Sequence, residues 1–136
     1  MNIIDTSLWI EFFAGTPLDE SIINILSNND KLYVPTICLY EVKKKFLIDN
    51  DIVKAVTAID IMKKGIVINI DSEIALLASD ISKQYKLPMA DSIIYATAVL
   101  WDAEIYTQDK HFKNLDQEGN LHPSGSIEVR VHYFSK

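Results

Sequence analysis

Four acidic residues stand far apart in this chain, and each lies beside a segment where a regular element is expected to begin or end. They are Asp5, Glu41, Asp91 and Asp109. Carboxylates crowded into one site raise one another's pKa, so they stay ionised together only if a cation binds among them. Sets of oxygen ligands suit Mg²⁺ or Mn²⁺. The sequence therefore predicts a divalent-cation site, provided that the fold brings these four side chains together.

Each of the four acids also has an ordinary structural explanation. Asp5 suits the N-cap of the helix expected after it, and Asp91 lies near a helix start, which the helix dipole favours. Glu41 is spaced to pair with Lys45 on an exposed helix face. Asp109 suits a turn or a cap. Asp91 fits this explanation least well, because its helix consists mostly of Ile, Ala, Val and Leu, where a carboxylate needs partners.

The composition predicts a single globular domain spanning residues 1–136. Hydrophobic residues make up 49% of the chain and charged residues 24%, which suffices for one core. No apolar run approaches the roughly 18 residues of a membrane-spanning helix, and the N-terminus lacks the basic start of a secretory signal. The single cysteine, Cys38, excludes an intramolecular disulfide and a cysteine-based zinc site. We therefore expect a cytoplasmic protein that does not enter a membrane.

The net charge of −6 argues against a protein that coats nucleic acid, because such proteins are basic. It does not exclude a nuclease, since bound divalent cations invert the local field of an acidic site. The densest basic run consists of Lys43, Lys44 and Lys45 and begins two residues after Glu41. These lysines are either a solvated helix face or contacts for phosphate groups.

Hydrophobic patterns predict strands interleaved with helices, which indicates an α/β fold with a mainly parallel sheet. In the helix expected after residue 51, Ile52, Val56, Ile59 and Met62 are expected to face inward. Residues 66–70 are β-branched and predict a buried strand. The polar segment 117–126 is expected to be a loop before a last strand at an edge of the sheet. The expected strands are 2–4, 32–34, 66–70, 104–107 and 127–134. The expected helices are 8–13 (capped by Thr6 or Ser7), 18–26, 36–48, 52–64, 72–85 and 90–100, with one or two helical turns in 110–115.

These elements suggest how the four acids meet. Asp5 follows the first expected strand, and Asp109 lies two residues after the strand that ends near Thr107. In open α/β sheets, sites form beyond the carboxyl ends of the strands, so both acids are expected at one crevice. Asp91 opens the buried helix and is expected to point into the same crevice. Glu41 lies on a helix whose apolar stripe faces the sheet.

With these motifs in order, the sequence resembles the PIN-domain ribonucleases, and most closely the VapC-type toxins of bacterial toxin–antitoxin pairs. Residues 3–10, Ile-Ile-Asp-Thr-Ser-Leu-Trp-Ile, are similar to the family's first-strand motif. Residues 36–42 occupy the place of its helical Glu. Residues 91–98, Asp-Ser-Ile-Ile-Tyr-Ala-Thr-Ala, and 107–112, Thr-Gln-Asp-Lys-His-Phe, resemble its third and fourth acidic motifs. The likeness extends over nearly the whole chain.

The resemblance implies a PIN-like α/β/α sandwich of three layers around a mainly parallel sheet. It implies that Asp5, Glu41, Asp91 and Asp109 form an acidic catalytic pocket for Mg²⁺- or Mn²⁺-dependent endonucleolytic cleavage of RNA. The usual partner would be a small antitoxin whose C-terminal tail blocks the pocket, and the protein would form a homodimer.

A mechanism follows as a hypothesis. Asp5 and Asp91 are expected to be the principal metal ligands, assisted by Asp109 directly or through water. Glu41 would orient or deprotonate the attacking water, or hold a second ion. The hydroxyls of Thr6 and Thr107 are candidates for fixing the carboxylate rotamers. The lysine run at 43–45 would contact phosphates as point charges.

Two other classes of protein remain open. A receiver-like phosphoacceptor domain is also α/β with an acidic Mg²⁺ pocket, and Asp71 after the strand 66–70 resembles its phosphoacceptor, although the first strand offers one acid instead of a pair. A non-catalytic PIN-like binding module would bind a partner without metal-dependent turnover. A histidine-based metal site is not expected, because His111, His122 and His132 lack ligand spacing and suit isolated surface positions.

Overall fold

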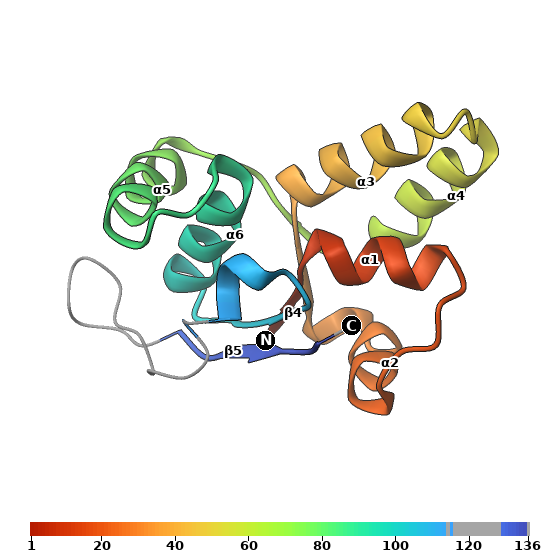
Figure 1. The fold of residues 1–136 in the computed structure, drawn as a ribbon, viewed down its shortest axis with the longest axis horizontal. Helices are drawn as coiled ribbons and strands as arrows, with labels where there is room; N and C mark the ends of the chain where they lie inside the picture. Colours follow the sequence, from red (N-terminus) through yellow and green to blue (C-terminus); the bar gives the residue numbers. More distant parts are fainter. Residues whose placement is uncertain (114, 116–128, 136) are drawn as a thin grey trace.

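In a computed structural model, which describes residues 1–113, 115 and 129–135, the chain forms a parallel sheet with helices on both faces (Figure 1). The described strands follow the order β3-β2-β1-β4-β5, and every pair is parallel. The strands are β1 (Asn2–Ile4), β2 (Leu32–Pro35), β3 (Ile66–Ile68), β4 (Glu104–Thr107) and β5 (Val131–Tyr133). The helices are α1 (Thr6–Phe13), α2 (Glu20–Leu26), α3 (Thr36–Ile48), α4 (Ile52–Met62), α5 (Ser72–Tyr85) and α6 (Met89–Leu100), with 3-10 turns η1 (Asn29–Lys31) and η2 (Lys110–Phe112).

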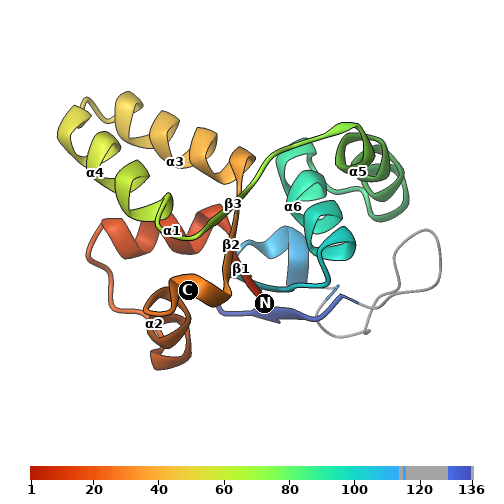
Figure 2. The ribbon, with the colours of Figure 1, turned by 180° about the vertical axis from the view of Figure 1, so that it is seen from behind.

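The chain crosses the sheet in two directions. From β1 it moves outward to β2 and β3 through α1 to α4, and the connection through α5 and α6 then returns it to β4, on the other side of β1. Crossovers between parallel strands are right-handed, so reversing the direction places the helices on the opposite face. Figures 1 and 2 show α1 to α4 on one side of the sheet and α5 and α6 on the other. The predicted three-layer α/β/α fold is confirmed.

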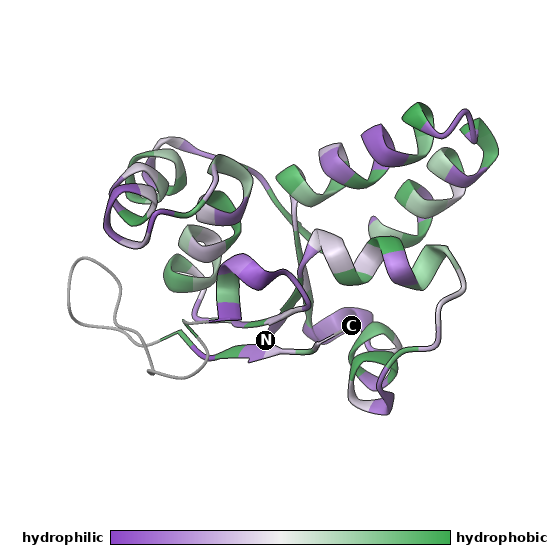
Figure 3. Cartoon of the chain, in the orientation of Figure 1, coloured by the Kyte–Doolittle hydropathy of each residue, from purple (hydrophilic) through white to green (hydrophobic). Residues whose placement is uncertain are grey.

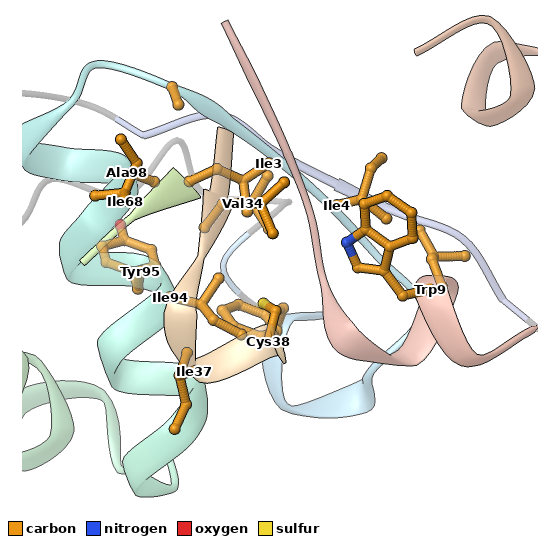
Figure 4. Close-up of a cluster of buried hydrophobic side chains, with 14 of the residues drawn as sticks. Ile3, Ile4, Trp9, Val34, Ile37, Cys38, Ile68, Ile94, Tyr95 and Ala98 are labelled. Atoms are coloured by element: carbon orange, nitrogen blue, oxygen red, sulfur yellow. The ribbon is translucent and has the colours of Figure 1, made fainter. Parts of the chain in front are cut away.

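Helix α6 is the most deeply buried helix, as its composition predicts. Eight of its twelve residues are buried, and Ile94 and Tyr95 share a core cluster with Ile3 of β1 and Val34 of β2 (Figure 4). In contrast, α3 and α5 carry both hydrophilic and hydrophobic residues (Figure 3). Their buried residues recur every three or four positions, as amphipathic helices require. Among the described residues, no helix combines the length and the apolar composition needed to cross a bilayer.

Two expectations about burial were wrong. The strand expected at 66–70 is not fully buried, because β3 forms an edge of the sheet and exposes Ile66. In α4, Ile52 is 67% exposed and Val56 also lies outside the core. Met62 is buried and Ile59 packs against the core, as expected, and the other buried residues of α4 are Ala55 and Ala58. Apolar residues lie all round α4, so the sequence pattern alone did not show which side packs against α3.

The last strand lies at the opposite edge of the sheet, as expected for the segment after Asp109. β5 pairs in parallel with β4, with Ile105 opposite Val131. Only part of the predicted strand 127–134 is described, and the loop expected at 117–126 lies outside the described residues.

Candidate functional site

The carboxylate of Asp5 lies at the end of β1, next to the end of β4. Its own N–H donates to the carbonyl of Tyr106 at 2.9 Å, which extends the ladder between the two strands up to the acid. The Thr107 hydroxyl donates to Oδ2 at 2.7 Å, the Ser7 hydroxyl donates to the same oxygen at 2.9 Å, and the Thr6 N–H donates to Oδ1 at 2.8 Å. A carboxylate has about four acceptor positions. Oδ1 of Asp5 therefore keeps one acceptor position for a further ligand.

Asp109 is held by the same threonine. Its N–H donates to the Thr107 hydroxyl oxygen at 2.9 Å, while that hydroxyl donates to Asp5. Oδ1 of Asp109 accepts from the N–H of His111 at 2.9 Å and so caps η2. One threonine side chain thus connects the ends of β1 and β4 and sets the positions of two of the acids.

Asp91 enters the site from the first turn of α6, and His111 bridges it to Asp109. Nδ1 of His111 lies 3.0 Å from Oδ2 of Asp91 and 2.8 Å from Oδ1 of Asp109. Ligand atoms of these three residues all lie within 4.8 Å of one another, and they form the one group of three such residues found in the described part of the chain.

Glu41 reaches the site from α3 through a hydrogen bond. The Thr6 hydroxyl donates to Oε1 of Glu41 at 2.7 Å. Because the N–H of Thr6 also donates to Asp5, this residue connects the two carboxylates. The alternative pairing of Glu41 with Lys45 is absent from the described contacts, since Lys45 pairs instead with Asp49 at 3.2 Å.

The site carries more negative charge than its surroundings balance. Burial, with the charge of Asp109 as a further cause, raises the pKa of Asp5 from 3.8 to about 6, although hydrogen bonds to its carboxylate act in the opposite direction. Burial and the charges of Asp5 and Asp109 raise the pKa of Asp91 from 3.8 to about 7, against the charge of His111. Among the described residues, no lysine or arginine forms an ion pair with any of the four acids.

This donor set fits a divalent cation. Asp5 is only 2% exposed and Asp91 only 7% exposed, and buried charges of one sign need a counter-charge. The available ligands are mainly carboxylate oxygens, which Mg²⁺ and Mn²⁺ prefer. Asp5 retains a free acceptor position, and Asp91 and Asp109 already lie at ligand-to-ligand distances. The arrangement can therefore hold a divalent cation.

The expectation that the histidines are isolated surface residues was wrong for two of them. His111 contacts two of the acids, because η2 turns the chain back toward α6 directly after Asp109. Nε2 of His132 lies 2.8 Å from Glu104, and its ring stacks on Tyr106 at 4.3 Å. The position of His111, two residues after a candidate site acid, was the available signal. His122 lies outside the described residues.

Ser7 was also missed by the sequence reasoning. Its hydroxyl donates to Asp5 and accepts from the N–H of Gln108 at 3.3 Å, so it joins α1 to the segment after β4. A hydroxyl residue two positions after a candidate acid was the signal in the sequence.

The lysine run lies on an exposed part of α3. All three lysines are exposed, Lys45 pairs with Asp49, and Nζ of Lys44 lies 5.6 Å from the centre of the Tyr40 ring. None of the described contacts joins these lysines to the acids, and their role in binding phosphate stays a prediction.

Asp71 does not resemble the phosphoacceptor of a receiver domain. Its carboxylate accepts from the N–H of Ile74 at 2.9 Å and caps α5. It follows β3, which is an edge strand separated from β1 by β2. The receiver-like alternative therefore lacks its central residue.

Comparison with known proteins adds a family and a set of related structures. The family model of the PIN domain matches residues 3–118. A toxin–antitoxin complex from Klebsiella pneumoniae contains a chain that is 25% identical, with a TM-score of 0.66 over 82% of this chain and 90% of that one. DNA-bound VapBC from Salmonella typhimurium is 14% identical, with a TM-score of 0.74 over 98% of each chain. No protein with a curated description matches the sequence significantly.

A third related structure is VapC20 of Mycobacterium tuberculosis, a toxin described as cleaving the Sarcin-Ricin loop. It is 16% identical, with a TM-score of 0.70 over 96% of this chain and 99% of that one. At this identity the likeness shows a shared fold, and it extends over nearly the whole of both chains.

Proposed function

Because the chain belongs to the PIN domain family, we propose that it is a divalent-cation-dependent endoribonuclease and the toxin of a toxin–antitoxin pair. The observation that carries this proposal is the meeting of Asp5, Glu41, Asp91 and Asp109 without a lysine or arginine counter-charge in the described part of the chain. The structural likeness to VapC20, described as a toxin that cleaves the Sarcin-Ricin loop, supports RNA as the substrate.

Asp5, Asp91 and Asp109 are the residues that would hold Mg²⁺ or Mn²⁺. When bound, such a cation lowers the pKa of water and offsets the charge that develops on the phosphate. Thr107 keeps Asp5 in one rotamer and Asp109 at a set position, through the hydroxyl that contacts both. Such supporting hydrogen bonds orient ligands and so raise the affinity of a metal site.

Glu41 is the residue that would orient or deprotonate the attacking water. Thr6 donates to Oε1 and orients the carboxylate, and Oε2 would accept the proton. The deprotonated water would then attack the phosphorus, the bond to the leaving ribose oxygen would break, and that oxygen would take a proton from solvent. Lys43, Lys44 and Lys45, exposed on the same helix as Glu41, would bind neighbouring phosphates of the RNA strand.

Chelation tests the metal requirement. Purified protein with single-stranded RNA is expected to cleave in Mg²⁺ or Mn²⁺, to stop in excess EDTA, and to recover when the cation is restored. Cleavage at the full rate in excess EDTA would overturn the metal-dependent mechanism. RNA binding without turnover in any of the three conditions would favour the alternative, a non-catalytic PIN-like binding module.

The same proposal includes a partner and an oligomeric state. Several of the related structures are complexes of toxin with antitoxin, which supports a small antitoxin that covers the acidic site, and we expect the free protein to be a homodimer. Expression of the chain should arrest growth, while co-expression of the small protein encoded beside it should restore growth. Asp5→Asn is the control that should not arrest growth. Toxicity that persists with the neighbouring protein would contradict this partnership, and light scattering measures the dimer directly.

A further inference from the structure

The imidazole of His111 lies where a ligand of the cation would lie. Its Nδ1 contacts Oδ2 of Asp91 at 3.0 Å and Oδ1 of Asp109 at 2.8 Å. In an octahedral shell with bonds of about 2.1 Å, neighbouring ligand atoms lie about 3.0 Å apart. Nδ1 of His111 is therefore spaced from each of the two carboxylate oxygens as neighbouring ligands of one ion are, although Asp91 and His111 come from different elements.

The backbone holds His111 in this place. Asp109 accepts from the N–H of His111 at 2.9 Å and caps the short turn η2. This hydrogen bond holds the Asp109 carboxylate next to His111. The side chain of His111 is 55% exposed, so the ring lies at the surface of the molecule. The ring is thus positioned for binding and takes little part in the core.

A nitrogen ligand changes which cation the site prefers. Mg²⁺ strongly favours oxygen ligands and sheds its water reluctantly, whereas sites with nitrogen donors favour first-row transition metals. On the premise of the metal-dependent function above, we propose that His111 is a ligand of the cation through Nδ1 and makes this site prefer Mn²⁺ to Mg²⁺. His111 then joins Asp5, Asp91 and Asp109 in the ligand set.

Metal binding measured apart from catalysis tests this role. Calorimetry gives the dissociation constants of Mn²⁺ and Mg²⁺ for the wild type, His111→Ala and His111→Gln, with circular dichroism as the check on folding. We expect the wild type to bind Mn²⁺ at least about tenfold more tightly than Mg²⁺, and both variants to lose most of that ratio. Pulsed electron paramagnetic resonance of bound Mn²⁺ should detect a directly coordinated ¹⁴N nucleus in the wild type and none in either variant.

The matched control is His132→Ala. His132 contacts Glu104 and Tyr106 on β4 and has no described contact with the four acids of the site. This variant should therefore keep both the ratio of Mn²⁺ to Mg²⁺ affinity and the ¹⁴N signal. An unchanged ratio and signal in folded His111→Ala would overturn the role of His111 while leaving the nuclease proposal intact. Cleavage that survives EDTA would overturn the nuclease mechanism. A wild type that binds Mg²⁺ but not Mn²⁺ would overturn the role of His111 alone, and a wild type that binds neither cation would overturn both.

Discussion

The carboxyl group of Asp91 is buried among like charges, and this has a consequence for stability. Its pKa in the folded, metal-free protein rises from 3.8 to about 7, first through burial and then through Asp5 and Asp109. A group with a raised folded-state pKa binds its proton more tightly when folded, so its contribution to stability is complete below about pH 4 and is lost as the pH rises to about 7. Asp5, with a pKa raised to about 6, acts in the same direction.

We therefore expect the free energy of unfolding of the metal-free protein to fall between about pH 4 and about pH 7. Asp91→Asn should remove a large part of that fall, because the amide cannot ionise, and should stabilise the metal-free protein at neutral pH. Urea unfolding in EDTA across this pH range measures the effect. Asp71→Asn, at the cap of α5, is the control that should keep the wild-type slope, and an Asp91→Asn slope equal to that of the wild type would count against the account.

The hydroxyl of Thr107 contacts both Asp5 and Asp109, so substitution of this residue tests whether the hydroxyl positions the two carboxylates for cleavage. Thr107→Val keeps the shape of the side chain and removes both hydrogen bonds. We expect kcat/KM for RNA cleavage to fall by about 10- to 100-fold, as for other residues that orient metal ligands. Thr107→Ser keeps the hydroxyl and should retain most of the activity; equal rates in the valine and serine variants would show that the hydroxyl is not needed.

The sequence revealed the site residues that closely follow a recognisable strand, and it did not reveal those that depend on less regular structure. Asp5 and Asp109 follow strands with clear β-branched or apolar patterns, so their common edge of the sheet was predictable. His111 was not, because its position depends on a short 3-10 turn and on the packing of that turn near α6. Local sequence carries little information about such a turn.

At the scale of elements, α6 is the helix whose packing supports the site, since it carries Asp91 and contacts both α3 and β4. Ile94 is completely buried in its core face. Ile94→Ala should lower the free energy of unfolding by about 2–5 kcal/mol. Ile52→Ala removes the same atoms from the exposed side of α4 and should change stability by less than about 0.5 kcal/mol. Denaturant titration of both variants measures the difference, and similar losses would show that α4 faces the core after all.

The order of the elements was predictable, but their burial was less so. Strands interleaved with helices, and the nearly all-apolar α6, followed from periodicity and composition. The exposed position of Ile52 and the edge position of β3 did not, because both depend on the order of strands in the sheet and on which side of α4 meets α3. Apolar residues occur on both sides of α4, and nothing local distinguishes an edge strand of Ile and Val from a central one.

At the scale of the whole molecule, the site is a consequence of topology. The chain reverses its direction across the sheet after β3, so β1 and β4 become neighbours although about a hundred residues separate them. Ligand sites of open α/β sheets form at such a switch point, beyond the carboxyl ends of the strands. The net charge of −6 agrees with a protein that relies on a bound cation, more than on a basic surface, to approach a phosphodiester.

The rate at which Asp5→Asn cleaves RNA, compared with the wild type and Asp71→Asn in saturating Mg²⁺, tests the central claim most directly. Both substitutions replace an acid that caps a helix, and asparagine caps a helix about as well. We expect a loss of at least about 100-fold for Asp5→Asn and near wild-type cleavage for Asp71→Asn. A folded Asp5→Asn protein that cleaves at the wild-type rate would contradict the central claim.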